Sequence, residues 1–250
     1  MKNVRAKKHL GQHFLNDEQI AYDITNLLSD GAKNVVEIGP GMGVLTQYLV
    51  KKDCKTEVVE IDRESVFYLR LNYPDLEIHE GDFLHLNLKE QYPYNFSLIG
   101  NFPYNISSQI LFKAFENRDQ IPEVVGMFQK EVAERIACKK GKTRGILSVF
   151  LQAFYDVEYC FTVDEHVFNP PPKVKSGVIK LVRNSRKELP VDEKKFKRVV
   201  KAGYNQRRKT LKNAMKPFEI INGNEIIDLL ALRAEQLSVD DFIKLTNHVR

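Results

Sequence analysis

Short apolar runs alternate along the first 150 residues with stretches whose apolar residues recur at helical spacing. Strands buried in a parallel sheet have the first pattern, and amphipathic helices have the second. The apolar runs predict strands at 34–38, 56–61, 76–79, 97–100 and 124–128, and the periodic stretches predict helices at 20–28, 44–52, 65–71, 107–115, 129–138 and 146–155. This alternation is typical of an α/β fold with a doubly wound parallel sheet, which binds ligands at the carboxyl ends of its strands.

The pattern changes in the last third of the chain. Two further strands, at 159–163 and 178–182, flank Pro170-Pro171-Pro172 and predict a hairpin-like finish to the sheet. After Asn184 only helical patterns follow, at 196–204, 210–215, 225–230 and 240–249. We therefore expect an α/β domain over residues 1–184 and a small helical domain over residues 185–250.

The charge of the 250-residue chain is distributed unevenly. Residues 173–216 contain 16 Lys and Arg but only three acidic residues, although the whole chain has a net charge of only +5. Residues 1–8 add four more cations, Lys2, Arg5, Lys7 and Lys8, so the remainder of the chain is net negative. A charged run is most often a solvated face, but segregation of this extent favours binding of a polyanion such as nucleic acid.

Other classes of protein lack support in the sequence. The three cysteines, Cys54, Cys138 and Cys160, are odd in number and far apart, and the six histidines show no metal-ligand spacing. We expect neither disulfides nor a metal site, and we find no nucleophile–base arrangement typical of a hydrolase. No run approaches the ~18 apolar residues of a membrane helix, and the basic N-terminus lacks the apolar segment of a secretory signal. These features predict a cytoplasmic protein without a membrane association.

A glycine-rich turn follows the first predicted strand, at Gly39-Pro40-Gly41-Met42-Gly43. Glycines at this bend let the backbone turn tightly and approach a ligand at the start of the next helix. The spacing differs from the G-x-G-x-x-G that binds a pyrophosphate. Glu60 ends the second strand, 21 residues after Gly39, where a carboxylate can accept hydrogen bonds from both ribose hydroxyls. A ribose without a pyrophosphate favours S-adenosylmethionine (SAM) over NAD; the alternative is a plain turn with a solvated Glu.

Asp82 follows the third predicted strand. Its carboxylate is expected at the same edge of the sheet, where it can accept a hydrogen bond from an adenine amino group. Asp is also a common turn residue, so both interpretations of this position stay open.

The fourth strand runs into Asn101-Phe102-Pro103-Tyr104. An adenine amine is a poor nucleophile because its lone pair is delocalised into the ring. Two acceptors, the Asn101 side-chain oxygen and the Pro103 carbonyl, can hold both N–H bonds, aim the lone pair at a sulfonium methyl and stabilise the charge that develops on nitrogen. Tyr104 offers a face on which an extruded base can stack. The alternative, an Asn-capped turn with a buried Tyr, explains less of this pattern.

Seven motifs together resemble one enzyme family, the ribosomal RNA adenine dimethyltransferases, and within it the KsgA type that acts on small-subunit rRNA. They are LGQHFLND (10–17), EIGPGMG (37–43), EID (60–62), GD (81–82), NFPYNIS (101–107), FNPPPKVKS (168–176) and NQRRKTLKN (205–213). The glycine motif occurs in many methyltransferases, whereas NFPY together with PPPKV is much more specific. The match is collinear from about residue 5 to the C-terminus.

The resemblance implies a Rossmann-like SAM-dependent methyltransferase domain and the transfer of four methyl groups, two to each of two adjacent adenosines in a loop near the 3′ end of that rRNA. It implies a SAM pocket that uses His13, Leu15, Gly39, Gly41, Glu60, Asp82 and Asn101. It also implies that Phe168 joins Tyr104 in holding the flipped adenine. The chain departs from the family where His13 replaces the usual Asn and where Phe102 replaces Leu.

A basic motif, Arg207-Arg208-Lys209, lies in the positively charged stretch, and Lys173 follows the three prolines. Arg is suited to bidentate phosphate contact, so we expect these four residues to bind rRNA. The alternative is a solubilising helix start. The expected partner is small-subunit rRNA within a pre-ribosomal particle, bound by a monomer of this protein.

Two other functions stay open. One is a resistance-type methyltransferase that acts on a single adenine of large-subunit rRNA, a group that shares motifs like NFPY and PPPKV. The other is a ribosome-assembly factor whose binding role outweighs its chemistry. Intact Glu60, Asn101, Pro103 and Tyr104 favour retained catalysis.

Overall fold

The structure, a computed structural model, describes residues 4–250 and divides into two compact units. Lys2 lies outside the described residues. Unit 1 comprises the chain up to Ala133 and Glu158–Arg183, and unit 2 comprises Glu134–Val157 and Asn184–Arg250. The second unit resumes where the sequence predicted a boundary, and it also contains an earlier segment, within which Phe150 packs on Phe196 with ring centroids 6.3 Å apart. The predicted assignment of catalysis to one domain and RNA contact to the other stays a prediction.

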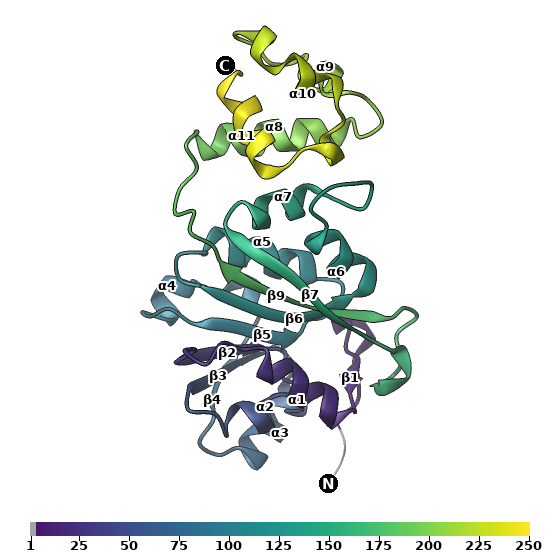
Figure 1. Cartoon of the computed structure of the whole chain (residues 1–250). Helices are drawn as coiled ribbons and strands as arrows, with labels where there is room; N and C mark the ends of the chain where they lie inside the picture. Colours follow the sequence, from purple (N-terminus) through teal and green to yellow (C-terminus); the bar gives the residue numbers. More distant parts are fainter. Residues whose placement is uncertain (1–3) are drawn as a thin grey trace. The chain divides into compact units, whose positions relative to one another are not determined.

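Unit 1 is built on a seven-stranded sheet (Figure 1). Its strand order is β4 (Glu77–Glu80), β3 (Lys55–Glu60), β2 (Asn34–Ile38), β5 (Ser97–Asn101), β6 (Glu123–Gln129), β9 (Ser176–Arg183) and β7 (Tyr155–Val163). The first five of these strands are parallel to one another, and β9 is antiparallel to β6. The prediction of a doubly wound, Rossmann-like sheet is confirmed, and β9 and β7 close it as the expected neighbouring pair.

Helices cover both faces of this sheet. In Figure 1, α1 (Glu18–Asn26), α2 (Thr46–Leu49) and α3 (Arg63–Asn72) lie on one side and α5 (Ser107–Glu116) lies on the other. Apolar residues of α1 and α2, and Leu45 just before α2, pack against those of the central strands in the main core; these include Ala21, Ile24, Leu45, Leu49, Val35, Ile99 and Val125. Strands covered on both faces lose their polar alternation, which explains the continuous apolar runs in the sequence.

Two predicted helices end at other residues than expected, and one short helix was not predicted. The helix expected at 44–52 is regular only over α2, because Lys51 and Lys52 donate to carbonyls three residues back and form tight turns. The helix expected at 146–155 ends at Gln152 as α7 (Ile146–Gln152), and Tyr155 already begins β7. Phe154 and Tyr155 are buried, so the apolar pattern alone does not place this boundary. The short helix α4 (Leu88–Gln91) was not predicted.

Unit 2 is helical except for the first residues of β7. Besides α7 it holds α8 (Glu193–Asn205), α9 (Leu211–Ala214), α10 (Ile227–Ala231) and α11 (Val239–Asn247), while α6 (Lys130–Ala137) runs across the division between the units. None of the helices within residues 4–250 combines the length and the apolar character that a bilayer crossing requires. The three cysteines are unpaired, as the sequence predicted.

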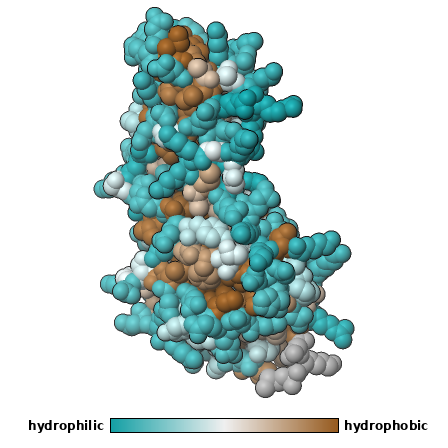
Figure 2. All heavy atoms as spheres, turned by 45° about the vertical axis from the view of Figure 1, so that its right-hand side comes forward, coloured by the Kyte–Doolittle hydropathy of each residue, from teal (hydrophilic) through white to brown (hydrophobic). Residues whose placement is uncertain are grey.

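Hydrophilic residues dominate the face drawn in Figure 2, and its apolar residues form separate small groups. The most exposed large apolar side chains are Phe67 and Leu71 of α3 and Ile227 of α10. Single exposed apolar residues of this kind are normal on a protein surface and carry no functional assignment.

Candidate active site

The glycine turn after β2 is held in a backbone conformation that only glycine adopts without strain. Gly39, Gly41 and Gly43 have φ angles of +64°, +57° and +82°. A Cβ atom added at Gly41 would lie 2.8 Å from the ring of Phe14, in the short strand β1 (Phe14–Leu15). The N-terminal segment therefore packs directly on this turn, and substitution at Gly41 would separate the two.

Glu60, the last residue of β3, lies directly beside the turn. Its side chain is only 3% exposed, and its two carboxylate oxygens accept hydrogen bonds from the backbone N–H groups of Gly41 (3.0 Å) and Asp62 (2.8 Å). Burial raises the pKa of Glu60. Each oxygen keeps a second lone pair for a ligand, so the carboxylate can both fix the turn and bind hydroxyl groups.

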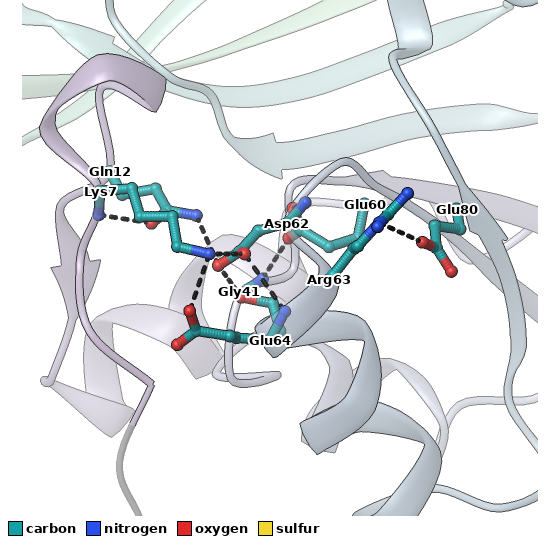
Figure 3. A network of polar contacts seen from close by, with 9 residues as sticks. Lys7, Gln12, Gly41, Glu60, Asp62, Arg63, Glu64 and Glu80 are labelled. Atoms are coloured by element: carbon teal, nitrogen blue, oxygen red, sulfur yellow. Dashed lines mark hydrogen bonds and ion pairs between the residues drawn. The ribbon is translucent and has the colours of Figure 1, made fainter.

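A network of polar contacts joins the N-terminal segment to the end of β3 (Figure 3). The ammonium of Lys7 is ion-paired with Asp62 and lies 3.0 Å from Glu64, and the Gln12 amide donates to Asp62 at 3.4 Å. Asp62 also caps the N-terminus of α3 through Glu64 N–H. These contacts hold residues 7–12 across the edge of the sheet where Glu60 and the glycine turn lie.

Asp82 follows β4 and has two roles in the geometry. Its carboxylate accepts a hydrogen bond from the Leu84 N–H at 2.8 Å, which caps the following turn, and it also faces the same cavity as Glu60. The Lys113 ammonium of α5 donates to the carbonyls of residues 83, 84 and 86 at 2.7, 2.9 and 2.6 Å. One half-buried cation thus fixes the loop that carries Asp82. The turn interpretation and the ligand interpretation of Asp82 are compatible.

Asn101 ends β5, and its side-chain amide is oriented by the N-terminal segment. The amide nitrogen donates to the backbone carbonyl of His13 at 2.9 Å, which leaves the amide oxygen as a free acceptor. The Pro103 carbonyl already accepts one hydrogen bond, from the Ile106 N–H at 3.1 Å, and keeps its second lone pair. Two acceptors with defined orientations therefore lie at this corner.

Tyr104 is anchored on two sides. Its hydroxyl is 2.5 Å from the Ser176 hydroxyl of β9, and its ring stacks on the His13 ring with centroids 5.5 Å apart. The His13 ring in turn donates from Nδ1 to the Pro170 carbonyl at 2.7 Å. His13 thus contacts Asn101 through its backbone, while its side chain joins Tyr104 to the proline loop. Burial raises the pKa of Tyr104, so its hydroxyl stays neutral.

Two motifs that are 150 residues apart in sequence form one small sheet. Strand β1 pairs antiparallel with β8 (Phe168–Asn169), with Leu15 opposite Phe168. Phe168 is 3% exposed and packs in the apolar core with Leu15. Phe168 is not among the residues that line the cavity of the other site residues, and its stacking role stays a prediction. Lys173, beyond the prolines, is exposed.

The predicted cofactor residues surround a single cavity of about 500 Å³. This volume lies in the range of small-molecule sites, which is ~300–1,000 Å³. The lining includes His13, Leu15, Gly39, Gly41, Glu60, Asp82, Asn101, Pro103 and Tyr104. The glycine turn, the two carboxylates and the two acceptors at Asn101 and Pro103 lie around one cavity because parallel strands end at one edge of the sheet.

Comparison with known proteins identifies the family. The model of the family described as Ribosomal RNA adenine dimethylase matches residues 3–249. The chain belongs to this family. It is also 61% identical over 253 residues, covering 99% of this chain and 98% of the relative, to Ribosomal RNA small subunit methyltransferase A of Cytophaga hutchinsonii.

Two solved structures are similar to the chain. A dimethyladenosine transferase from Plasmodium falciparum has a TM-score of 0.81 at 25% identity and covers 95% of this chain and 99% of its own. The 23S rRNA methyltransferase ErmE has a TM-score of 0.75 at 22% identity, covers 94% and 99%, and shows the fold alone. This member of the rRNA adenine dimethylase family is thus an enzyme of the methyltransferase class with a Rossmann-like fold.

The basic motif of this rRNA adenine dimethylase lies in unit 2. Arg207, Arg208 and Lys209 follow the end of α8 and are exposed. The Arg207 Nε donates to the carboxylate of Glu235 at 3.1 Å, whereas no described residue forms an ion pair with Arg208 or Lys209. Arg207 is therefore held in place with part of its guanidinium exposed. The side chains of Arg208 and Lys209 are exposed to solvent without a described ion pair.

One group of potential metal ligands lies at the opposite, amino ends of β3 and β4. Oxygen or nitrogen atoms of Glu57, Glu77 and His79 lie within 4.8 Å of one another. The Lys55 ammonium, however, lies 2.6 Å from Glu57 and 3.0 Å from Glu77, and supplies the positive charge that these carboxylates require. The group is thus an ion-pair network, and the expectation that the enzyme uses no metal stays a prediction.

The sequence analysis did not assign a role to Glu37, the acidic residue just before the glycine turn. Its side chain is 1% exposed, lines the cavity and accepts a hydrogen bond from the Thr46 hydroxyl at 2.6 Å. Burial, with a smaller effect from the Glu60 carboxylate, raises the pKa of Glu37 to about 8. Its position before the glycines was the only available signal, because burial is not visible in sequence.

The raised pKa of Glu37 predicts a pH-dependent stability. Between its ordinary pKa of 4.5 and about 8, the folded chain retains a proton that the unfolded chain releases. The stabilising contribution of Glu37 to the free energy of unfolding is therefore complete below pH 4.5 and is lost as the pH rises to about 8. We expect the free energy of unfolding in urea to fall less steeply over this range in Glu37→Gln than in the wild type, with exposed Glu90→Gln as control. Parallel curves for all three proteins would contradict a buried, protonated Glu37.

Proposed function

We propose that this enzyme transfers methyl groups from SAM to the exocyclic amines of two adjacent adenosines near the 3′ end of small-subunit (16S) rRNA, two to each. Family membership and the name of the Cytophaga hutchinsonii relative support the rRNA substrate. We further propose that it acts as a monomer in the cytoplasm, on rRNA within a pre-ribosomal small subunit, and takes part in small-subunit biogenesis.

The cavity fits SAM in size and in chemistry. It offers a buried carboxylate, Glu60, with lone pairs left for ribose hydroxyls, and a second carboxylate, Asp82, on a fixed loop for an adenine amine. Within the glycine turn the backbone is open to close approach at Gly39, where an added Cβ atom would meet only Pro103 Cδ, at 3.9 Å. SAM supplies an electrophilic methyl group when bound. The proposed methyl transfer from the SAM sulfonium to an amine needs no metal ion.

The orientation of Asn101 is the observation that carries the catalytic proposal. With its amide nitrogen donating to His13, its oxygen and the Pro103 carbonyl accept the two N–H bonds of the target amine. The nitrogen lone pair is then freed from the ring, and both carbonyl dipoles stabilise the positive charge that develops on nitrogen. The proton becomes acidic only after transfer, so no general base is required. The anchored Tyr104 ring supports the extruded base.

The alternative substrate is a single adenine in large-subunit rRNA. ErmE shares the fold, so the fold does not separate the two. The NQRRKTLKN motif and the 61% identity to a small-subunit enzyme favour the first substrate. An assembly factor with secondary catalysis is the other alternative, and the preserved acceptor corner argues against a loss of chemistry.

A methyl-incorporation assay tests this proposal directly. Small and large subunits from cells that lack the enzyme are incubated separately with the protein and SAM carrying a labelled methyl group. We expect label in the small subunit only, as dimethyladenosine at two neighbouring positions. Label in large-subunit rRNA alone would identify the resistance-type activity, and tight binding to small subunits without any label would identify an assembly factor.

A further inference from the structure

The loop between α6 and α7 carries positive charge that the function has not yet explained. It contains Lys139, Lys140 and Lys142, all exposed, and none of them forms an ion pair with another residue in the part of the chain that the structure describes. These lysines precede the long basic stretch by about 30 residues, so the charge pattern alone does not connect them with it. The loop lies in unit 2, together with Arg207, Arg208 and Lys209.

The loop has a defined conformation. At its centre Gly141 has a φ of +113°, which disfavours any residue with a side chain, and the Arg144 N–H donates back to the Gly141 carbonyl at 3.0 Å. The Cys138 thiol donates to the Lys140 carbonyl at 3.2 Å. The lysines are therefore presented on a tight turn and not on a flexible tail.

Glu235 joins this loop to the basic motif. Its backbone carbonyl accepts a hydrogen bond from the Gly141 N–H at 2.8 Å, and its carboxylate accepts one from Arg207 Nε at 3.1 Å. One residue thus contacts the centre of the lysine turn and the first cation of the basic motif. The lysine turn and the start of the basic motif therefore lie close together, on either side of Glu235.

A second contact supports the same arrangement. Arg144, at the end of the loop, is 2% exposed and lies beside Tyr204 of α8, three residues before Arg207. Burial raises the pKa of Tyr204 to about 12, and the Arg144 charge acts in the opposite direction. The buried Arg144 side chain therefore brings the end of the loop next to the end of α8.

We propose that Lys139, Lys140 and Lys142 form, with Arg207, Arg208 and Lys209, one continuous surface that binds the phosphate backbone of rRNA. We call it the lysine-turn surface. The inference rests on the proposed rRNA substrate and extends the contact region to a segment outside the basic motif. It concerns the backbone of the RNA and assigns no base recognition to this surface.

Charge and composition favour RNA over an acidic protein as the partner. The surface carries six cations, and the carboxylate of Glu235, which contacts Arg207, is mostly buried and paired with it. The exposed loop residues are three lysines and Thr143, without the aromatic or aliphatic anchor that protein interfaces concentrate at their centre. A surface of positioned lysines and arginines without an apolar anchor is suited to neutralise the phosphates of RNA.

The test compares two doubly substituted proteins of equal charge. Lys140→Gln with Lys142→Gln removes two cations from the lysine-turn surface. Lys187→Gln with Lys194→Gln is the matched control, since both are exposed lysines of unit 2 without a described ion pair. Lys194 lies at the start of α8, roughly 16 Å along the helix from its end near Arg207. Both variants should keep the wild-type melting temperature, because the side chains are exposed.

The measured quantity is the affinity for unmethylated small subunits, and for a transcript of their 3′ rRNA domain, from 50 to 200 mM salt. Each lost phosphate contact lowers the slope of log affinity against log salt by roughly 0.7–0.9. We expect the loop variant to lose about two such contacts, so that its affinity ratio between the two salt concentrations falls by roughly tenfold. The control variant should keep the wild-type slope on both probes.

A third variant, with Arg207, Arg208 and Lys209 all changed to Gln, separates the possible failures. If it loses slope while the loop variant does not, the basic motif binds rRNA and the lysine turn is only a solvated face. If neither variant changes the slope, the placement of the rRNA contact in unit 2 is wrong. If the loop variant loses affinity for subunits but not for the bare transcript, the loop contacts a ribosomal protein and the inference is overturned.

Discussion

Replacing Asn101 by alanine should slow methyl transfer by on the order of 10²–10³-fold, which is the usual effect of removing one preorganised hydrogen-bonding partner of the developing charge. The effect should fall mainly on the single-turnover rate, because the Asn101 oxygen acts on the amine while its nitrogen is already bound to His13. SAM affinity should change far less, by the ~0.5–1.5 kcal/mol of one hydrogen bond.

The matched control for Asn101 is Asn87→Ala, an exposed asparagine of unit 1 that does not line the cavity. It should leave rate and affinity unchanged. Single-turnover measurements with saturating SAM and unmethylated small subunits check both variants. An Asn101→Ala enzyme that methylates at the wild-type rate would remove Asn101 from the catalytic corner, and a loss confined to SAM binding would restrict it to the cofactor site.

Much of the site was predictable because parallel strands impose it. Glu60 and Asn101 end a strand, Gly39 and Asp82 follow one, and the observed order of β2 to β5 brings these strand ends to one cavity. The sequence needed to supply only the strands and the residues just after them. Which ligand atoms these residues contact stays a prediction.

The parts that sequence did not predict depend on contacts between distant segments. Strands β1 and β8 have two residues each, too short for a period-two pattern, yet their pairing carries His13 to Asn101 and buries Phe168. The unusual His13 gains a partner, Pro170, that no local pattern indicates. Burial of Glu37 is likewise a tertiary property, and so is the raised pKa that follows from it.

The division into units could be predicted only in part from the sequence. The change from strands to helices after Asn184 is a local signal, and the second unit resumes there. The earlier segment 134–157 has the same amphipathic pattern as the other helices, and only its packing, such as Phe150 on Phe196, assigns it to unit 2. The lysine turn is therefore found from structure and not from the charge pattern.

Replacing Glu60 by alanine should weaken SAM binding by on the order of 1–3 kcal/mol through the loss of charge-assisted hydrogen bonds. This corresponds to a roughly 5- to 150-fold higher Kd. Calorimetry with the folded variant measures it. The matched control is Glu64→Gln, because Glu64 belongs to the same network through Lys7 but is exposed and does not line the cavity.

The Glu60 carboxylate also holds the Gly41 N–H, so a weaker affinity alone does not prove contact with the ribose. An analogue of S-adenosylhomocysteine that lacks the ribose hydroxyls separates the two effects. If Glu60 binds these hydroxyls, the wild type should lose affinity for the analogue, whereas Glu60→Ala should bind the analogue and the parent compound nearly equally. If both proteins lose the same factor, Glu60 acts only by shaping the glycine turn, and the ribose contact must be assigned to another residue of the cavity.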